Sequence, residues 1–240
     1  RNYFENHFGP FYRIEQVIIT AKNLPEIIHK TDKENITFGP VFHEDFLLKV
    51  LDIQESIQKI DNGSLGEICF APLRMPGEKS TKISECAVQS IWGYFQDSED
   101  ELNEAYLNRL RKCFANPYSY DCLGRYRGPI DPAIALGGFL KPGDNLAKNP
   151  QYESATTLIL TFLLNNHRDQ TKLNRAMEWE KKFVDYMLNL TSSINSSMFD
   201  IAFTSERSIE DELDRSSKSD IYTIIVSCLL MFAYISISLG

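Results

Sequence analysis

The sequence has few of the residues that build metal centres or active sites. Its four histidines, His7, His29, His43 and His167, lie far apart, and no C-x-x-C pair occurs among its five cysteines. Zinc sites need ligands at closer, more regular spacings. The chain also lacks a G-x-S-x-G elbow, a Walker phosphate loop and a G-x-G-x-x-G fingerprint. We therefore expect no metal, no cofactor and no enzymatic activity.

Basic charge is scarce as well. The sequence has 25 Lys and Arg residues against 33 Asp and Glu residues, which gives a formal net charge of -8. Domains that bind nucleic acid usually carry a basic stripe, so no nucleic acid partner is expected. Two dense acidic runs, at residues 97–101 and 206–214, are typical of solvated faces. Catalytic carboxylates need partial burial instead.

One long stretch lacks charge altogether. Residues 221–240 contain no charged side chain, and about 20 such residues form a helix long enough to span a bilayer. We expect a transmembrane helix over residues 220–240. The residues before it have the composition of a soluble domain, so the chain is expected to be a lumenal or extracellular part of a larger membrane protein.

The cysteines indicate an oxidising compartment. Cys228 lies in the apolar stretch, and the other four, Cys69, Cys86, Cys113 and Cys122, allow three disulfide pairings. The local pairs, Cys69 with Cys86 and Cys113 with Cys122, are favoured because each closes a short loop. Four free thiols in a cytosolic protein are the alternative.

Four glycosylation sequons favour the same compartment. They begin at Asn35, Asn62, Asn189 and Asn195, in polar or element-ending stretches. Together with the cysteines and the apolar stretch, they predict a glycoprotein of the secretory pathway.

Hydrophobic patterning predicts an α+β domain over residues 14–219, after a membrane-proximal segment at residues 1–13. Strands are expected at residues 14–20, 133–139, 156–164 and 199–203. The run at residues 156–164 is continuously apolar, so we expect it in the sheet centre, covered on both faces.

Helical spacing of apolar residues predicts the other elements. Helices are expected at residues 43–60, 83–95 and 169–190, with another ending near Cys113, and residues 21–40 are expected to be loop. Trp92 and Trp179 are expected in the core. The order of elements favours a ferredoxin-like β-α-β-β-α-β core with an α/β insertion, followed by the transmembrane helix.

Several strings carry a family resemblance. H-F-G-P-F-Y-R at residues 7–13 is followed by E-I-C-F-A-P-L at residues 67–73, with shorter matches at residues 94–96, 136–138 and 161–166. The strongest string, F-T-S-E-R-S-I-E-D-E-L at residues 203–213, leads into F-A-Y-I-S-I-S-L-G at residues 232–240. On these residues the chain resembles the middle lumenal domain of the Niemann–Pick type C cholesterol transporters, running into the first helix of their sterol-sensing region.

The resemblance implies a membrane transporter that exports cholesterol from late endosomes and lysosomes. The lumenal domain of that family is not an enzyme. It binds the soluble Niemann–Pick type C sterol carrier, and the sterol then passes to an N-terminal domain outside this sequence. The resemblance also implies an α+β core and the local disulfide pairing.

Members of the family bind their partners through two protruding loops. In this sequence the loops fall near residues 24–38 and 97–106, and the second is acidic and lacks a pair of phenylalanines at its tip. Aromatic anchors usually dominate an interface, so we expect this chain to hold the carrier by charge more than by insertion, or through a different surface. The predicted partner-binding residues are Ile27, Ile28, His29, Glu99, Asp100 and Tyr106.

Two other functions stay open. The same domain type occurs in the intestinal sterol-uptake paralogue, which works from the plasma membrane with the domain extracellular. The other alternative is a domain that binds a secreted ligand, in another membrane protein of the sterol-sensing superfamily. The string at residues 203–213 argues against this last alternative.

Overall fold

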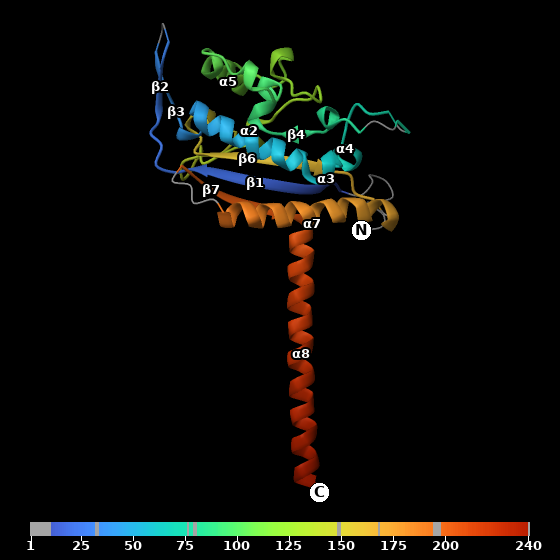
Figure 1. Cartoon of the computed structure of the whole chain (residues 1–240). Helices are drawn as coiled ribbons and strands as arrows, with labels where there is room; N and C mark the ends of the chain where they lie inside the picture. The colour runs from blue at the N-terminus through green and yellow to red at the C-terminus, as the bar shows by residue number, and fades with distance from the viewer. Residues whose placement is uncertain are drawn as a thin grey trace.

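The structure, a computed structural model, describes residues 11–31, 34–75, 77–78, 81–147, 150–167, 169–193 and 198–239. A body of mixed helix and sheet stands on one long helix, α8 (Glu206–Leu239), as Figure 1 shows. The predicted α+β class is therefore confirmed. Most of the predicted membrane-proximal segment, residues 1–13, lies outside the described residues, so its role stays a prediction.

An antiparallel sheet forms the centre of the body. Its path is β4 (Val88–Gln89), β6 (Thr157–Leu164), β1 (Arg13–Ala21) and β7 (Phe199–Ser205), and β5 (Leu136–Gly137) also pairs with β6. Val17 of β1 lies opposite Leu160 of β6 on one side and Phe203 of β7 on the other. The three predicted strands at residues 14–20, 156–164 and 199–203 are confirmed. The ferredoxin-like topology stays a prediction, because β4 has only two residues.

Two long helices cover the same face of this sheet. Phe46 of α2 (Glu44–Gln58) meets Phe199 edge to face, with ring centroids 6.1 Å apart. Phe183 of α7 (Gln170–Ser193) meets Phe203 in the same way, also at 6.1 Å. Phe199 and Phe203 are four residues apart on β7, and alternate strand residues share a face. Both helices were predicted from their apolar stripes.

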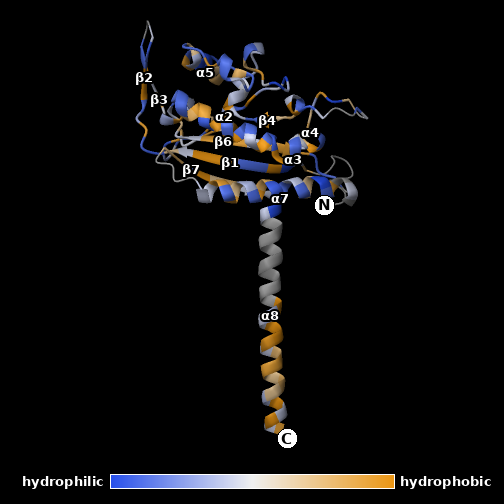
Figure 2. Ribbon diagram, in the orientation of Figure 1, coloured by the Kyte–Doolittle hydropathy of each residue, from blue (hydrophilic) through white to orange (hydrophobic). Residues whose placement is uncertain are grey.

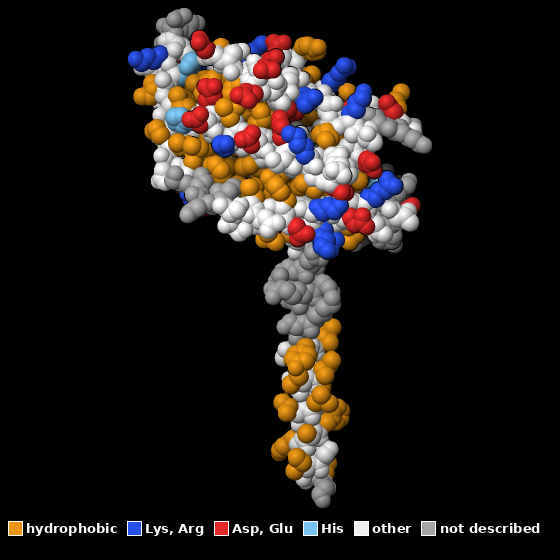
Figure 3. All heavy atoms as spheres, viewed as in Figure 1, with side chains coloured by type: hydrophobic (Ala, Val, Ile, Leu, Met, Phe, Trp, Pro, Cys, Tyr) orange, Lys and Arg blue, Asp and Glu red, His pale blue; other side chains and the backbone are white. Residues whose placement is uncertain are grey.

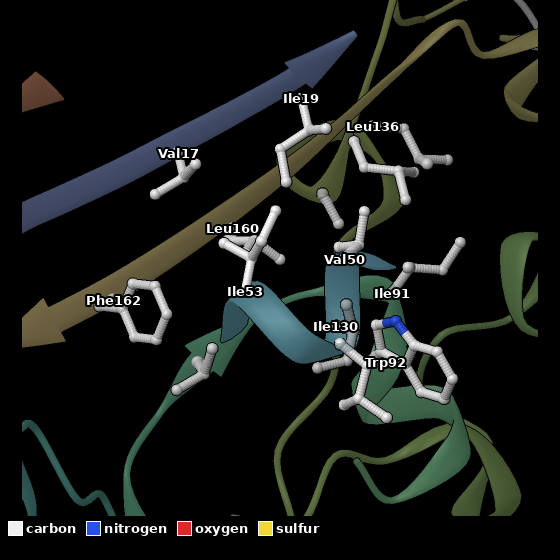
Figure 4. Close-up of a cluster of buried hydrophobic side chains, with 14 of the residues drawn as sticks. Val17, Ile19, Val50, Ile53, Ile91, Trp92, Ile130, Leu136, Leu160 and Phe162 are labelled. Atoms are coloured by element: carbon white, nitrogen blue, oxygen red, sulfur yellow. The ribbon is translucent and has the colours of Figure 1, made fainter. Parts of the chain in front are cut away.

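The core lies between α2 and the sheet. Figure 4 shows Val17 and Ile19 of β1 and Leu160 of β6 directed toward Val50 of α2, with Trp92 beyond them. Trp92 is fully buried, and its indole nitrogen donates a hydrogen bond to the Leu47 carbonyl at 2.8 Å. Trp179 on α7 is also buried. The predicted core positions of both tryptophans are confirmed.

The loop predicted at residues 21–40 is wrong in its second half. Residues there form a hairpin of β2 (Ile27–Lys30) and β3 (Asn35–Phe38), in which Ile27 pairs with Phe38. Phe38 is fully buried and meets Phe42, with ring centroids 5.5 Å apart. Packing of this side chain stabilises a hairpin whose strands are too short and polar to give a clear pattern.

The helix predicted at residues 83–95 is also wrong. The chain forms two short 3-10 helices, η2 (Ile83–Glu85) and η3 (Ile91–Phe95), on either side of β4. Cys86 is bonded to Cys69, and Val88 pairs with Phe162 of β6. The disulfide and the sheet pairing hold this segment extended, against its helical apolar spacing.

Two predictions about the sheet need smaller corrections. The expected strand at residues 133–139 begins as a short helix, α6 (Pro132–Ala135), because the Asp131 side chain caps it through the Ala133 amide at 2.9 Å. β6 was expected to be covered on both faces, but Thr157, Ile159 and Leu163 are only partly buried. Its central position with partners on both edges explains the apolar run.

The remaining short elements connect these layers. They are η1 (Pro40–Phe42), α3 (Ile60–Gly63), α4 (Leu65–Ile68), η4 (Glu99–Glu101), α5 (Tyr106–Ala115), η5 (Tyr120–Cys122) and η6 (Tyr152–Ser154). α5 lies on the side of the body opposite α8 (Figure 1).

The C-terminal part of α8 has the length and composition of a membrane span. Within the described ranges, the window Ile221–Leu239 is the one that qualifies, with a mean hydropathy of 2.1 and none of it buried in the body. Figure 2 shows this hydrophobic half below the body, and Figure 3 shows apolar side chains around its whole visible face. A bilayer is the environment that would cover such a surface.

Candidate docking surface

The β2–β3 hairpin projects from the body on the side away from α8 (Figure 1). Its turn is closed by Thr31, whose hydroxyl donates to the Glu34 carbonyl at 2.8 Å. Residues 32 and 33, at the turn itself, lie outside the described residues. At the base of the hairpin, His43 and the Pro25 carbonyl are 2.9 Å apart in a hydrogen bond.

Two polar contacts join the hairpin to α5. His29 Nε2 and Asn108 Oδ1 lie 2.8 Å apart, and Arg111 pairs with Glu34 at 2.6 Å. Asn108 and Arg111 are three residues apart and so share one face of the helix. Sequence reasoning missed Asn108, Arg111 and Glu34 as parts of this surface. The helical spacing of Asn108 and Arg111 upstream of Cys113 was the available signal for those two residues.

The predicted residues of the first loop divide between two faces of β2. Ile28 is 66% exposed, whereas Ile27 and His29 are partly buried. Side chains alternate along a strand, so Ile28 points away from the body while its neighbours point toward it. Ile28 is therefore the apolar side chain of this hairpin strand that a partner can reach.

The predicted residues of the second loop are split as well. Glu99 and Asp100 are exposed on η4, and Glu99 lines a cleft of about 450 Å³ together with Asp45 and Lys49 of α2. Glu101 forms a salt bridge with Arg109, with 2.9 Å between its carboxylate oxygen and a guanidinium nitrogen. The structure thus places Glu99 and Asp100 on an acidic edge beside α2, and His29 beside α5.

Tyr106 does not project from the surface. It is partly buried, and its hydroxyl donates a hydrogen bond to the Phe42 carbonyl at 2.9 Å. Burial, and secondarily the Glu44 carboxylate, raises the pKa of Tyr106. This side chain positions the start of α5 against the body, and its role in partner binding stays a prediction.

A buried ion pair lies at the other end of the body, where the sheet meets α8. The guanidinium of Arg13 makes two hydrogen bonds to the carboxylate of Glu180, one of them 2.8 Å long. Both side chains are almost completely buried. The two residues are 167 positions apart, so the pair fixes α7 to the start of β1.

Glu15 is the unusual member of this region. It is fully buried, and within the part of the chain that the structure describes neither carboxylate oxygen has a partner at full hydrogen-bond geometry. It pairs in register with Ser205, the last residue of β7. Burial is the main cause that raises the pKa of Glu15 from 4.5 to about 8, and the carboxylates of Glu180 and Glu206 raise it further. The Ser205 hydroxyl and the Arg13 guanidinium act in the opposite direction but do not offset burial.

Two disulfides brace the body in the local pairing. Cys69–Cys86 joins the residue after α4 to the segment before β4, with 5.5 Å between the Cα atoms. Cys113–Cys122 joins α5 to η5 across 5.4 Å. The second bond fixes the helix that carries the hairpin contacts, which links disulfide formation to the docking surface.

The glycosylation candidates lie on three different elements. Asn35, Asn62 and Asn189 are exposed on β3, α3 and α7. Asn195 lies outside the described residues. Glycan attachment at any of them stays a prediction.

The described residues contain no group of side chains that could together bind a metal ion. Over the described ranges, no three His, Cys, Asp or Glu side chains are close enough together to hold a metal ion. The hairpin and α5 present one large exposed apolar side chain, Ile28, together with hydrogen-bonding groups and charges of both signs.

Comparison with known proteins identifies the family. Residues 1–207 match the family model for the NPC1 middle luminal domain. The chain is 40% identical to NPC intracellular cholesterol transporter 1 homolog 1b of Drosophila melanogaster and 36% identical to NPC intracellular cholesterol transporter 1 of Sus scrofa. Each alignment covers 100% of this chain and 20% of the relative.

A second group of relatives is more distant. NPC1-like intracellular cholesterol transporter 1 of Rattus norvegicus is 30% identical, again over 100% of this chain and 20% of the relative. The chain thus spans about a fifth of the length of the curated relatives that it matches. It belongs to the family of NPC1 middle luminal domains.

Proposed function

We propose that this domain binds a soluble sterol-carrier protein in the lumen of late endosomes or lysosomes, so that cholesterol is handed on for export. The support is twofold: the relatives are named as cholesterol transporters, and the structure has a projecting hairpin opposite its apolar helix. The domain itself acts as a docking module and not as an enzyme. The sterol is the cargo of the carrier and of domains beyond this chain.

The single observation that carries the proposal is the attachment of the hairpin to α5. The His29–Asn108 and Arg111–Glu34 contacts hold the hairpin beside the helix, so Ile28 is presented on a fixed strand. A pre-ordered surface loses less conformational entropy when a partner binds. With α8 in a membrane, the hairpin lies on the distal side, where a soluble protein can reach it.

Charge supports the same function. Glu99, Asp100 and Glu101 form an exposed acidic edge on η4. Acidic groups on a surface increase the association rate of a partner that carries a basic surface. We infer that Ile28 supplies the apolar contact and that η4 attracts the carrier.

The test is binding of the purified chain, in neutral detergent micelles, to the soluble sterol carrier of the same organism. Affinity is measured with and without cholesterol at about pH 5 and about pH 7, which lie on either side of the pKa of an unperturbed imidazole. The Ile28→Ser variant is expected to bind at least about 10-fold more weakly, as loss of an interface anchor does. The matched control is Leu188→Ser, since Leu188 is 54% exposed on α7 at the base.

Two results contradict the proposal. One is no binding at either pH, with or without sterol. The other is equal binding by the parent chain and the Ile28→Ser variant, which would place the carrier on another surface.

The NPC1-like relatives favour a second candidate function. All of this chain aligns with the rat NPC1-like protein at 30% identity. The same domain type therefore occurs in the NPC1 relatives and in the NPC1-like relatives. The alternative is a sterol-uptake protein of the plasma membrane, with this domain extracellular. Localisation of the full-length protein by microscopy distinguishes the two: a lysosomal marker supports export, and a surface label supports uptake.

A further inference from the structure

A large basic cleft lies beside the docking surface, between α5 and the segment of residues 120–127. Its volume is about 1060 Å³. Four basic side chains line it, Arg109, Lys112, Arg125 and Arg127, against one acidic side chain, Asp121. The chain has a formal net charge of -8, so this group of basic side chains has the opposite sign to the charge of the protein as a whole.

The outer wall of the cleft is a fixed turn. Arg125 and Arg127 are exposed on either side of Tyr126, which is buried. The Tyr126 hydroxyl accepts a hydrogen bond from the Gln89 amide at 2.6 Å and donates one to the Pro129 carbonyl. Buried anchoring of the central residue therefore holds the two arginines in place.

The backbone of the turn is closed on itself. The Gly124 amide donates to the Gly128 carbonyl at 2.9 Å, and the Arg127 amide donates to the Gly124 carbonyl at 2.8 Å. Arg127 has a φ of 60°, in the left-handed region. A non-glycine residue in this region is uncommon and persists where surrounding contacts hold it.

The inner wall is α5, and two of its cations are already paired. Arg109 binds Glu101 and lies over the Phe95 ring, 5.6 Å from its centroid. Lys112 pairs with Asp121 at 2.6 Å across the cleft. The Cys113–Cys122 disulfide joins the two walls.

The two arginines of the turn are both exposed to solvent. Arg125 lies near enough to the Asp97 carboxylate to interact with it electrostatically, and no salt bridge holds either guanidinium among the described residues. Tyr120 also lines the cleft and is 88% exposed. Two exposed guanidinium groups beside an exposed aromatic ring form a site for carboxylates, because guanidinium binds carboxylate through two parallel hydrogen bonds.

We propose that this cleft binds an extended acidic segment of a partner protein, with Arg125 and Arg127 on its carboxylates and Tyr120 at the rim. The position favours a protein over a lipid headgroup, because α5 lies on the side of the body opposite the apolar end of α8 (Figure 1). Headgroups of the membrane that holds α8 are therefore out of reach. The cleft contains none of the six predicted carrier-binding residues, but it shares Asn108 of α5 with the docking surface, so the two sites adjoin each other.

The experiment measures fluorescence anisotropy of a labelled peptide of eight glutamates with the full chain in neutral detergent micelles. An equally labelled peptide of eight serines is the peptide control. The test variant is Arg125→Gln with Arg127→Gln. The matched control is Lys141→Gln with Lys181→Gln, which removes the same charge from exposed positions outside the cleft.

The glutamate peptide is expected to bind, and the cleft variant is expected to weaken it at least about 10-fold, as loss of charge-assisted hydrogen bonds does. The control variant is expected to change the affinity less than about twofold, because screened surface charges contribute little. Circular dichroism of both variants checks that the fold is intact.

Three results overturn the proposal. The first is no binding of the glutamate peptide. The second is equal weakening by the cleft variant and the control variant, which would show attraction to the whole surface. The third is that inorganic phosphate or phosphatidylserine vesicles bind at Arg125 and Arg127 while the peptide does not, which would make the cleft a phosphate site.

Discussion

Replacing Glu15 by glutamine tests the buried carboxyl at the base of the sheet. Glu15 is fully buried, and the Ser205 hydroxyl and the Arg13 guanidinium do not offset the effect of that burial. Its pKa is raised from 4.5 to about 8. The folded domain therefore keeps the proton over a range of pH in which the unfolded chain has lost it.

The sign and size of the effect follow from this difference. A raised carboxyl pKa leaves stability intact below about pH 4.5 and lowers it progressively up to about pH 8, where the whole penalty is reached. Each pH unit in between removes about 1.4 kcal/mol. From about pH 5 to about pH 7 the domain should therefore lose about 3 kcal/mol through Glu15 alone.

The assay is denaturant unfolding of the chain in detergent micelles, followed by fluorescence of the buried Trp92 and Trp179. Glu15→Gln has a neutral side chain of similar shape and does not titrate. The free energy of unfolding of the variant minus that of the parent chain should therefore rise by about 3 kcal/mol between about pH 5 and about pH 7. Other titrating groups are shared by both proteins and cancel in the difference. Glu178→Gln, at an exposed position on α7, is the matched control and should follow the parent.

Parallel stability curves for the parent and Glu15→Gln would refute this reasoning. They would mean that Glu15 ionises normally, and hence that water or a partner group reaches its carboxylate.

Three further predictions concern other parts of the fold. The double variant Cys113→Ser, Cys122→Ser should unfold about 2–4 kcal/mol more easily and bind the glutamate peptide more weakly; unchanged denaturation would contradict it. Glu180→Ala leaves the buried Arg13 without this carboxylate and should cost about 3–5 kcal/mol, measured in the same assay; a loss below about 1 kcal/mol would show that water reaches the pair. Gly39→Ala should abolish folded protein in a size-exclusion assay, because its new Cβ would lie 1.9 Å from a backbone oxygen; a normal elution volume would show that the backbone can move.

Local patterns gave the regular elements correctly. The alternating and β-branched runs that became β1, β6 and β7 are confirmed, as are the apolar stripes of α2 and α7. In elements of this length the spacing of apolar residues repeats often enough to identify a helix or a strand from the sequence alone. The same reasoning failed at residues 83–95, where pairing of Val88 with Phe162 and the Cys69–Cys86 bond outweigh helical spacing.

The resemblance implies a protruding loop near residues 24–38, and the structure has a projecting hairpin there that was not expected. Partner binding by this segment stays a prediction. Tyr106 was predicted as a partner-binding residue of the second loop, and the structure turns its hydroxyl toward the Phe42 carbonyl. Side-chain direction at a helix start depends on what the helix packs against, which no local pattern contains.

By itself, the sequence determined the α+β class, the long helices, the central strands and the apolar C-terminal helix, because each depends on the spacing of apolar residues within one segment. Only the tertiary structure decided which distant residues meet. Arg13 and Glu180 are 167 positions apart, and the basic cleft needs a disulfide, a closed turn and α5 together. Such sites arise from the packing of several segments at once, so their chemistry is visible only when the chain is folded.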